Sequence, residues 1–115
     1  MSLKILAEDI AVCGQLMPSD LDAIAAEGYK TLINNRPDNE GPDQPARAEL
    51  EAKARSLGLT VHYLPMATGT PPSVELLQAF NAIFEAAEKP VLAFCRTGNR
   101  SGQIYSGAMA LKAGK

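Results

Sequence analysis

Short apolar stretches alternate with longer mixed segments along the chain, which is the pattern of strands separated by helices. Each stretch is three to six residues long and is bounded by glycine, proline or polar turn residues. The run at 91–94 is apolar throughout and therefore predicts a central strand buried on both faces. The predicted strands span residues 3–6, 10–13, 31–33, 59–64 and 91–94.

The segments between the strands carry helix signals. Pro18 opens a pattern with apolar residues on one face and Gly28 closes it, since proline suits the first helical turn and glycine the position after the last. Gly58 ends a second helix-compatible segment, and Ser73 caps an amphipathic third one. The predicted helices span residues 18–27, 45–57, 73–87 and 101–113.

This order of elements predicts an α/β fold. Parallel strands need helical crossovers, so the alternation indicates three layers, with a mostly parallel central sheet and helices on both faces. In such sheets the binding crevice lies outside the C-terminal ends of the strands. We therefore expect the functional site in the loops at those ends, which span residues 34–44, 66–72 and 95–100.

Composition adds the expected class of protein. With 115 residues, 46% of them apolar and 21% charged, we expect one globular domain over residues 1–115. No apolar run approaches the roughly 20 residues of a membrane helix, and the N-terminus lacks the features of a signal peptide, so we expect a cytoplasmic protein without a membrane partner. Two cysteines and one histidine are too few for a disulfide framework or structural zinc, so no metal or cofactor is expected.

Charge is distributed unevenly. The last 27 residues, from Lys89, contain five basic and no acidic side chains, whereas the first 88 contain six basic and all 13 acidic ones. This gives +5 and −7 for the two parts, although the net charge is only −2. The basic residues are neither clustered nor interleaved with aromatic residues, so we expect no nucleic-acid partner. A small anionic group near Cys95 fits the pattern better.

Cys95 stands between the predicted central strand and the start of the last helix. Unpaired backbone N–H groups and the helix dipole favour an anion at such a place, and nearby arginines lower the pKa of a thiol. Gly98 lets the loop turn its amides inward. We therefore predict a nucleophilic thiolate in a cradle of N–H donors. The predicted site comprises Cys95 and Arg100 as catalytic residues, with Arg96, Thr97, Gly98, Asn99 and Ser101 binding the anion.

The alternative for any cysteine is a buried structural role, because free cysteine is among the most buried residues. The two arginines, the glycine and the strand-to-helix position favour the reactive site for Cys95. Cys13 has no such context and is predicted to be a core or strand residue, with a resolving thiol as the lesser alternative.

The loop from Cys95 to Ser101 resembles the active loop of rhodaneses, and it approaches the Cys-(five residues)-Arg signature of protein tyrosine and dual-specificity phosphatases. With the stretches 10–15 and 34–38, it resembles the phosphatase-like domain of beta-lactamase hydrolase-like proteins, a bacterial family described as phosphatases or sulfur transferases. The resemblance covers nearly all the chain. It implies the dual-specificity phosphatase fold, with the last strand at the centre of the sheet.

Three departures from the phosphatase pattern affect the expected chemistry. Four residues, not five, separate Cys95 from Arg100, so the ring is one residue short and should suit a single sulfur better than a phosphoryl group. Phe94 stands where phosphatases usually have histidine. The loop at 66–70, where these phosphatases place a general-acid aspartate, has no carboxylate to protonate a leaving alkoxide.

Two residues of the loop at 34–44 are further candidates. Asp38 is a candidate replacement acid, although an aspartate after proline is also typical of a turn. Arg36 is a candidate for binding an anionic substrate, or else a solvated loop arginine. His62, in an apolar strand, receives no role.

The sequence therefore leaves three functions open. Sulfur transfer ranks first because it needs no general acid for its first step: Cys95 would carry a persulfide taken from thiosulfate or another persulfide, held by Arg100 and Arg96, and pass it to a thiophilic acceptor. The alternative is a phosphatase that acts on a phosphoester through a Cys95 thiophosphate, with Asp38 as acid. The third is a non-catalytic module that binds a persulfide or an anion. A neighbouring domain in a longer parent protein is a further expected partner.

Overall fold

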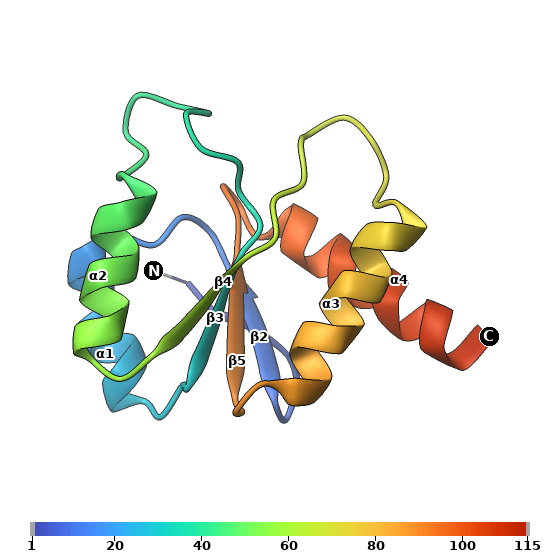
Figure 1. Ribbon diagram of the computed structural model, residues 1–115, viewed down its shortest axis with the longest axis horizontal. Coiled ribbons are helices and arrows are strands. Elements are labelled where there is room, and N and C mark those ends of the chain that lie inside the picture. Colours follow the sequence, from blue (N-terminus) through green and yellow to red (C-terminus); the bar gives the residue numbers. More distant parts are fainter. Residues whose placement is uncertain (1, 115) are drawn as a thin grey trace.

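Five short strands form one sheet in the order β1-β2-β5-β3-β4, with helices on both sides (Figure 1). The structure is a computed structural model and describes residues 2–114. The strands are β1 (Lys4–Ala7), β2 (Ile10–Cys13), β3 (Thr31–Asn34), β4 (Thr60–Tyr63) and β5 (Val91–Phe94). The helices are η1 (Pro18–Asp20, a 3₁₀ turn), α1 (Leu21–Ala26), α2 (Arg47–Ser56), α3 (Val74–Ala86) and α4 (Asn99–Gly114).

The sheet is mostly parallel. Strand β5 lies at its centre, parallel to both β2 and β3, and β4 is parallel to β3. Strand β1 alone runs antiparallel, as the short connection to β2 requires. The predicted α/β class and the predicted central position of residues 91–94 are confirmed.

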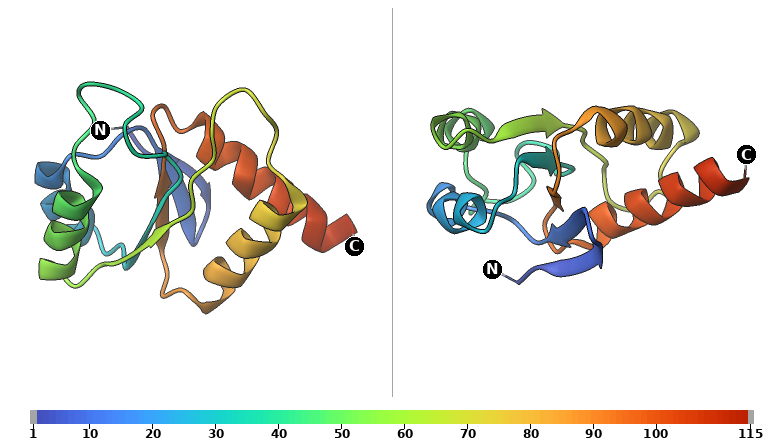
Figure 2. Two further views of the ribbon diagram at one scale, coloured as in Figure 1. Left: turned by 45° about the horizontal axis from the view of Figure 1, so that its top comes forward. Right: turned by 90° about the horizontal axis from the view of Figure 1, so that it is seen from below.

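The core has two halves because side chains along a strand alternate between the faces of the sheet. Leu92 and Phe94 of β5 pack in a cluster with residues of α1 and α2, whereas Val91 and Ala93 pack in a cluster with α3 and α4. Figures 1 and 2 show these two helix pairs on opposite faces. No helix within residues 2–114 is long and apolar enough to cross a membrane.

The boundaries of the α-helices differ from the predicted ones by one to three residues, and the first and last helices show why. The first helix begins as a 3₁₀ turn, where the Asp20 carboxylate accepts a hydrogen bond from the Met17 amide at 2.8 Å, and becomes an α-helix only at Leu21. The last helix begins at Asn99 rather than at residue 101, because the amide of Gly102 already donates to the carbonyl of Gly98 at 2.9 Å. Arg100 and Ser101 therefore belong to the first turn of α4.

The loops after β3, β4 and β5 meet at one end of the sheet. The amide of Asn35 donates to the carbonyl of Phe94 at 2.8 Å, and the amide of Met66 donates to the carbonyl of Asn35 at 2.9 Å. These loops lie together at the top of the molecule in Figure 1. The expected crevice at the C-terminal strand ends is thus where the chain brings its candidate residues together.

Candidate active site

The residues after β5 wrap around the sulfur of Cys95. The side chain is buried, and the amide of Gly98 donates to its Sγ at 3.0 Å. The backbone amides of Ser101, Thr97 and Arg100 also lie close enough to this sulfur to lower the pKa of its thiol. Those of Arg100 and Ser101 lie in the first turn of α4, where an N–H group lacks an intrahelical acceptor. The amide ring thus extends to Ser101, one residue beyond Arg100.

The amide ring determines the ionisation of Cys95. Burial raises the pKa of the thiol, but the backbone hydrogen bonds from Ser101, Thr97, Gly98 and Arg100 together outweigh burial, so the pKa lies below its ordinary value. Burial, and next the charge of Cys95, raise the pKa of Cys13 to about 12. Cys95 is therefore the more readily ionised of the two thiols, and Cys13 stays protonated as a core residue.

Alkylation should distinguish the two thiols. Thiolates are the species that react, so we expect Cys95 to be modified by iodoacetamide with a midpoint below the free-thiol pKa of about 8.5, and Cys13 to stay unmodified at neutral pH. Peptide mapping after alkylation across a pH series measures both, with Cys13→Ala as the control. A midpoint for Cys95 at or above 8.5 would contradict the stabilisation of its thiolate.

Close backbone packing holds the loop in place. Gly98 has a φ of 97°, and a Cβ at this residue would lie 3.3 Å from the carbonyl carbon of Cys13. Both restrictions favour glycine. On the other side of the loop the amide of Gln15 donates to the carbonyl of Arg96 at 3.2 Å. The loop after Cys95 therefore packs against the C-terminal end of β2 and the residues that follow it.

The guanidinium of Arg100 forms hydrogen bonds with the loops after β3 and β4. Its Nη1 and Nη2 donate to Oε2 and Oε1 of Glu40, both at 2.9 Å, and Nη1 also donates to the carbonyl of Met66 at 2.8 Å. The hydrogen bonds to Glu40, and more weakly the charge of Cys95, raise the pKa of Arg100, so the guanidinium stays charged. A permanent cation thus lies beside the thiolate.

Glu40 was not among the residues predicted from the sequence. Besides Arg100 it accepts from Nε of Arg36 at 3.0 Å, and Nη1 of Arg36 donates to Oε1 of Gln15 at 2.9 Å. The hydrogen bond from Arg100 is the main cause that lowers the pKa of Glu40, so this carboxylate is ionised and a poor proton donor. Glu40 joins the two buried arginines to each other.

The structure places Asp38 away from this network. Its carboxylate accepts from Nε of Arg47, at the start of α2, at 3.2 and 3.3 Å. Its amide donates to the hydroxyl of Tyr63, and the guanidinium of Arg47 stacks over that ring at 4.0 Å. The loop at 34–44 therefore brings Glu40, rather than Asp38, to Arg100.

The remaining predicted residues either stabilise the loop or face solvent. Ser101 is buried, and its hydroxyl donates to Oδ1 of Asn35 at 2.8 Å, whose own amide group donates to the carbonyl of Leu64. Thr97 and Asn99 are exposed, and the Thr97 hydroxyl accepts from the Asn99 amide at 3.3 Å. Ser101 thus has a buried structural contact in addition to its amide in the cradle.

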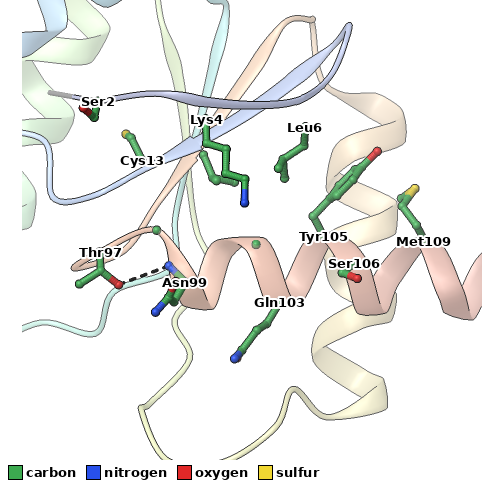
Figure 3. Close-up of a pocket in the computed structure, with 13 residues that line it drawn as sticks. Ser2, Lys4, Leu6, Cys13, Thr97, Asn99, Gln103, Tyr105, Ser106 and Met109 are labelled. Carbon is green, nitrogen blue, oxygen red and sulfur yellow. Dashed lines mark hydrogen bonds between the residues drawn. The ribbon is translucent and has the colours of Figure 1, made fainter.

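Two cavities border the cradle. One, of about 380 Å³, has Arg36, Arg96 and Glu40 among its lining residues. The other, of about 720 Å³, lies between the β1 edge and α4 and does not include Cys95 (Figure 3). In Figure 3 Lys4 points toward α4 across this second cavity. Neither cavity is lined by Cys95 or Arg100, and the second is lined by Thr97, Gly98 and Asn99 of the loop after Cys95. Within residues 2–114 no group of three or more His, Cys, Asp or Glu side chains is arranged to hold a metal ion.

Comparison with known proteins decides the family. The family described as beta-lactamase hydrolase-like protein, phosphatase-like domain, matches residues 2–112. The chain belongs to this family. It is 33% identical to the beta-lactamase hydrolase-like proteins of Agrobacterium fabrum and Xylella fastidiosa, over 98 and 106 residues, which are 85% and 92% of this chain. The chain spans only 22% and 24% of the length of those two relatives.

Solved structures place the fold among Cys-based phosphatases. A candidate phosphatase from Neisseria meningitidis has a TM-score of 0.88 at 33% identity, covering 97% of this chain and 79% of that one. Tk-PTP in its active form has a TM-score of 0.73 at 25% identity, covering 99% and 76%. The core catalytic domain of the PP-IP phosphatase SIW14 from S. cerevisiae, at 17% identity, has a TM-score of 0.73, covers 96% and 66%, and supports the fold alone.

These similarities bear on the functions that the sequence left open. They confirm the predicted fold and the predicted family. The phosphatase alternative is supported better than sulfur transfer, which the sequence ranked first. The rhodanese-like character of the loop, the persulfide and the thiosulfate donor gain no support.

Proposed function

We propose that this domain is a Cys-dependent phosphatase that hydrolyses phosphomonoesters of phenolic alcohols. The observation that carries the proposal is a buried thiolate inside a ring of backbone amides, with the Arg100 guanidinium at its rim. Amides and a guanidinium are the donors that stabilise the charge on a transferring phosphoryl group. The similarity to Cys-based phosphatases agrees with this chemistry.

The reaction would take place in two steps. The Cys95 thiolate attacks phosphorus, so that an S–P bond forms, the P–O bond to the phenol breaks, and phenolate leaves. Water then attacks the thiophosphate, releasing inorganic phosphate and restoring the thiolate. In both steps the amides of Thr97, Gly98 and Ser101 stabilise the phosphoryl oxygens, and Arg100 adds its charge.

Phenolic esters are proposed because the site lacks a carboxylic acid placed to protonate the leaving group. The loop at 66–72 contains no Asp or Glu. The carboxylate of Asp38 is paired with Arg47, and Glu40 has a lowered pKa. A phenolate leaves without a proton, whereas an alkoxide does not.

A series of phosphate esters tests this proposal. We expect kcat/KM to fall steeply as the pKa of the leaving alcohol rises, because no general acid offsets the intrinsic difference between aryl and alkyl phosphates, an offset that is usually roughly 10²- to 10⁴-fold. Steady-state kinetics across substituted phenyl phosphates and simple alkyl phosphates measure the slope. A shallow dependence that becomes steep in Asp38→Asn would show that Asp38 is an acid after all.

Sulfur transfer stays the second candidate, because the spacing of four residues between Cys95 and Arg100 still differs from the phosphatase signature. In that reaction the thiolate attacks the outer sulfur of thiosulfate, an S–S bond forms, and sulfite leaves. The extension of the amide ring to Ser101 weakens the argument that the cradle is too small for phosphate. A sulfur adduct on Cys95 after incubation with thiosulfate, without phosphatase activity, would favour sulfur transfer.

A further inference from the structure

The guanidinium of Arg100 has five N–H donors, and its contacts use three of them. Both N–H groups of Nη1 are taken, one by Oε2 of Glu40 and one by the carbonyl of Met66, and one N–H group of Nη2 is taken by Oε1 of Glu40. The N–H of Nε and the second N–H of Nη2 take no part in these three hydrogen bonds, and the guanidinium lies close enough to the Cys95 sulfur for a hydrogen bond that helps to raise the pKa of Arg100.

The two remaining donors lie on one edge of the planar group. Nε–H and the adjacent Nη2–H point the same way, as a fork that matches two oxygens of a phosphoryl group. Glu40 occupies the other edge, formed by Nη1 and Nη2. An oxyanion can therefore bind to Arg100 without displacing Glu40.

We propose that Glu40 is a positioning residue, which fixes the guanidinium of Arg100 so that its Nε/Nη2 edge is presented to the substrate's oxyanion above Cys95. This inference rests on the proposed function, because it assumes that the site binds a phosphoryl group.

Glu40 is itself held in place. Nε of Arg36 donates to the carboxylate at 3.0 Å, and Gln15 accepts from Nη1 of Arg36 at 2.9 Å. The side chains of Arg36, Arg100 and Glu40 are 6%, 8% and 21% exposed, so the ion pairs are largely shielded from solvent. The hydrogen bond from Arg36 thus fixes the orientation of the Glu40 carboxylate, and the carboxylate in turn fixes the orientation of the Arg100 guanidinium.

The opposite role for Glu40 is an internal plug that occupies the anion site. The two roles predict opposite effects when the carboxylate is removed. A plug competes with the substrate, so its loss should tighten anion binding. A positioning residue orders the arginine before the anion arrives, so its loss should weaken binding by the cost of ordering that side chain.

Protection of Cys95 from alkylation by inorganic phosphate measures anion binding without requiring catalysis. In Glu40→Gln an amide N–H₂ group replaces one of the two carboxylate oxygens that accept hydrogen bonds from Arg100. We therefore expect that about tenfold more phosphate is needed to halve the alkylation rate, and that kcat/KM for phenyl phosphate falls by a similar factor. Glu40→Asp keeps the charge and should restore part of the effect. Glu51→Gln is the matched control, because Glu51 pairs with Arg47 away from the cradle.

The outcomes separate this inference from the proposed function. An unchanged or smaller phosphate requirement in both Glu40 variants would overturn the positioning role, as would a wild-type protein that phosphate does not protect. The pH midpoint of Cys95 alkylation should stay close to wild type in the Glu40 variants. A shift in this midpoint large enough to account for the weaker phosphate protection would also overturn the positioning role, because general damage to the cradle would then explain the change. If wild-type protein binds phosphate in a Glu40-dependent way but hydrolyses no ester, only the proposed function fails.

Discussion

Replacing Cys95 with serine should abolish phosphatase activity, lowering kcat/KM for aryl phosphates by roughly 10⁴-fold or more, as the loss of a catalytic nucleophile does. The amides of Thr97, Gly98, Arg100 and Ser101 stabilise a thiolate, which exists near neutral pH because the pKa of Cys95 is lowered. A serine hydroxyl stays protonated there, and an activating base is required for it to attack. The wild-type rate should rise with pH as Cys95 loses its proton, and level off once it is ionised.

The matched control is Cys13→Ala, which removes the other buried thiol. Cys13 belongs to the core cluster on the α1 and α2 face, so this change should lower thermal stability and leave kcat/KM within a few-fold of wild type. Steady-state kinetics with phenyl phosphates and thermal unfolding of both variants provide the comparison. Residual activity of Cys95→Ser above a tenth of wild type would exclude Cys95 as the nucleophile.

Arg100→Lys should lower kcat/KM by about 10²- to 10³-fold, the range found when one oxyanion donor is removed. Lysine keeps the charge but lacks the planar fork, so it cannot bind Glu40 and a phosphoryl group through two separate edges. The pair with Glu40 is mostly buried, so the variant should also unfold at a lower temperature.

Arg47→Lys is the control for Arg100→Lys, because Arg47 also makes two ion pairs but lies at the surface. We expect its kinetics to match wild type, since exposed ion pairs contribute little. Kinetics and thermal midpoints of the two variants should be measured together. Unchanged kinetics for Arg100→Lys would remove Arg100 from the site, and a collapsed midpoint with normal activity would make it purely structural.

The sequence predicted those parts of the protein that depend on neighbours in the chain. The apolar run at 91–94 predicted the central strand, and the strand-to-helix position of Cys95 with Gly98 predicted the amide cradle. Both features follow from local patterns, because the buried strand, the turn and the first helical turn are consecutive. The boundary of α4 differed by two residues because the turn at Gly98 already begins the helical hydrogen bonds.

The sequence did not predict the partner of Arg100. Glu40 and Arg100 are 60 positions apart, and their contact depends on the path of the loop after β3. Within that loop Asp38 was the candidate acid, yet it pairs with Arg47. Carboxylates two residues apart in an irregular loop cannot be ranked by pattern, because the fold of the loop decides which one faces the arginines. The signal that the sequence offered was only general: the loop that carries Arg36 also contains carboxylates that could pair with it, or with Arg96 and Arg100 of the loop after Cys95.

The ranking of functions depended on counting residues between Cys95 and Arg100. The count of four suggested a contracted ring, and it placed sulfur transfer above phosphate hydrolysis. The amides that lower the pKa of Cys95 extend to Ser101, and their number does not depend on the position of the arginine. The position of an arginine in the chain is a poor guide to ring size because its long side chain reaches the site from a range of backbone positions.

The covalent intermediate on Cys95 provides the most direct test of the central claim. Wild-type protein should be mixed with an excess of a phenyl phosphate, quenched in acid within the first turnover, and analysed by intact mass and peptide mapping. We expect one phosphoryl group on the peptide that contains Cys95 in the wild-type protein and none in Cys95→Ser. A wild-type protein that releases phosphate without this adduct, or that gains only a sulfur atom from thiosulfate on Cys95, would contradict it.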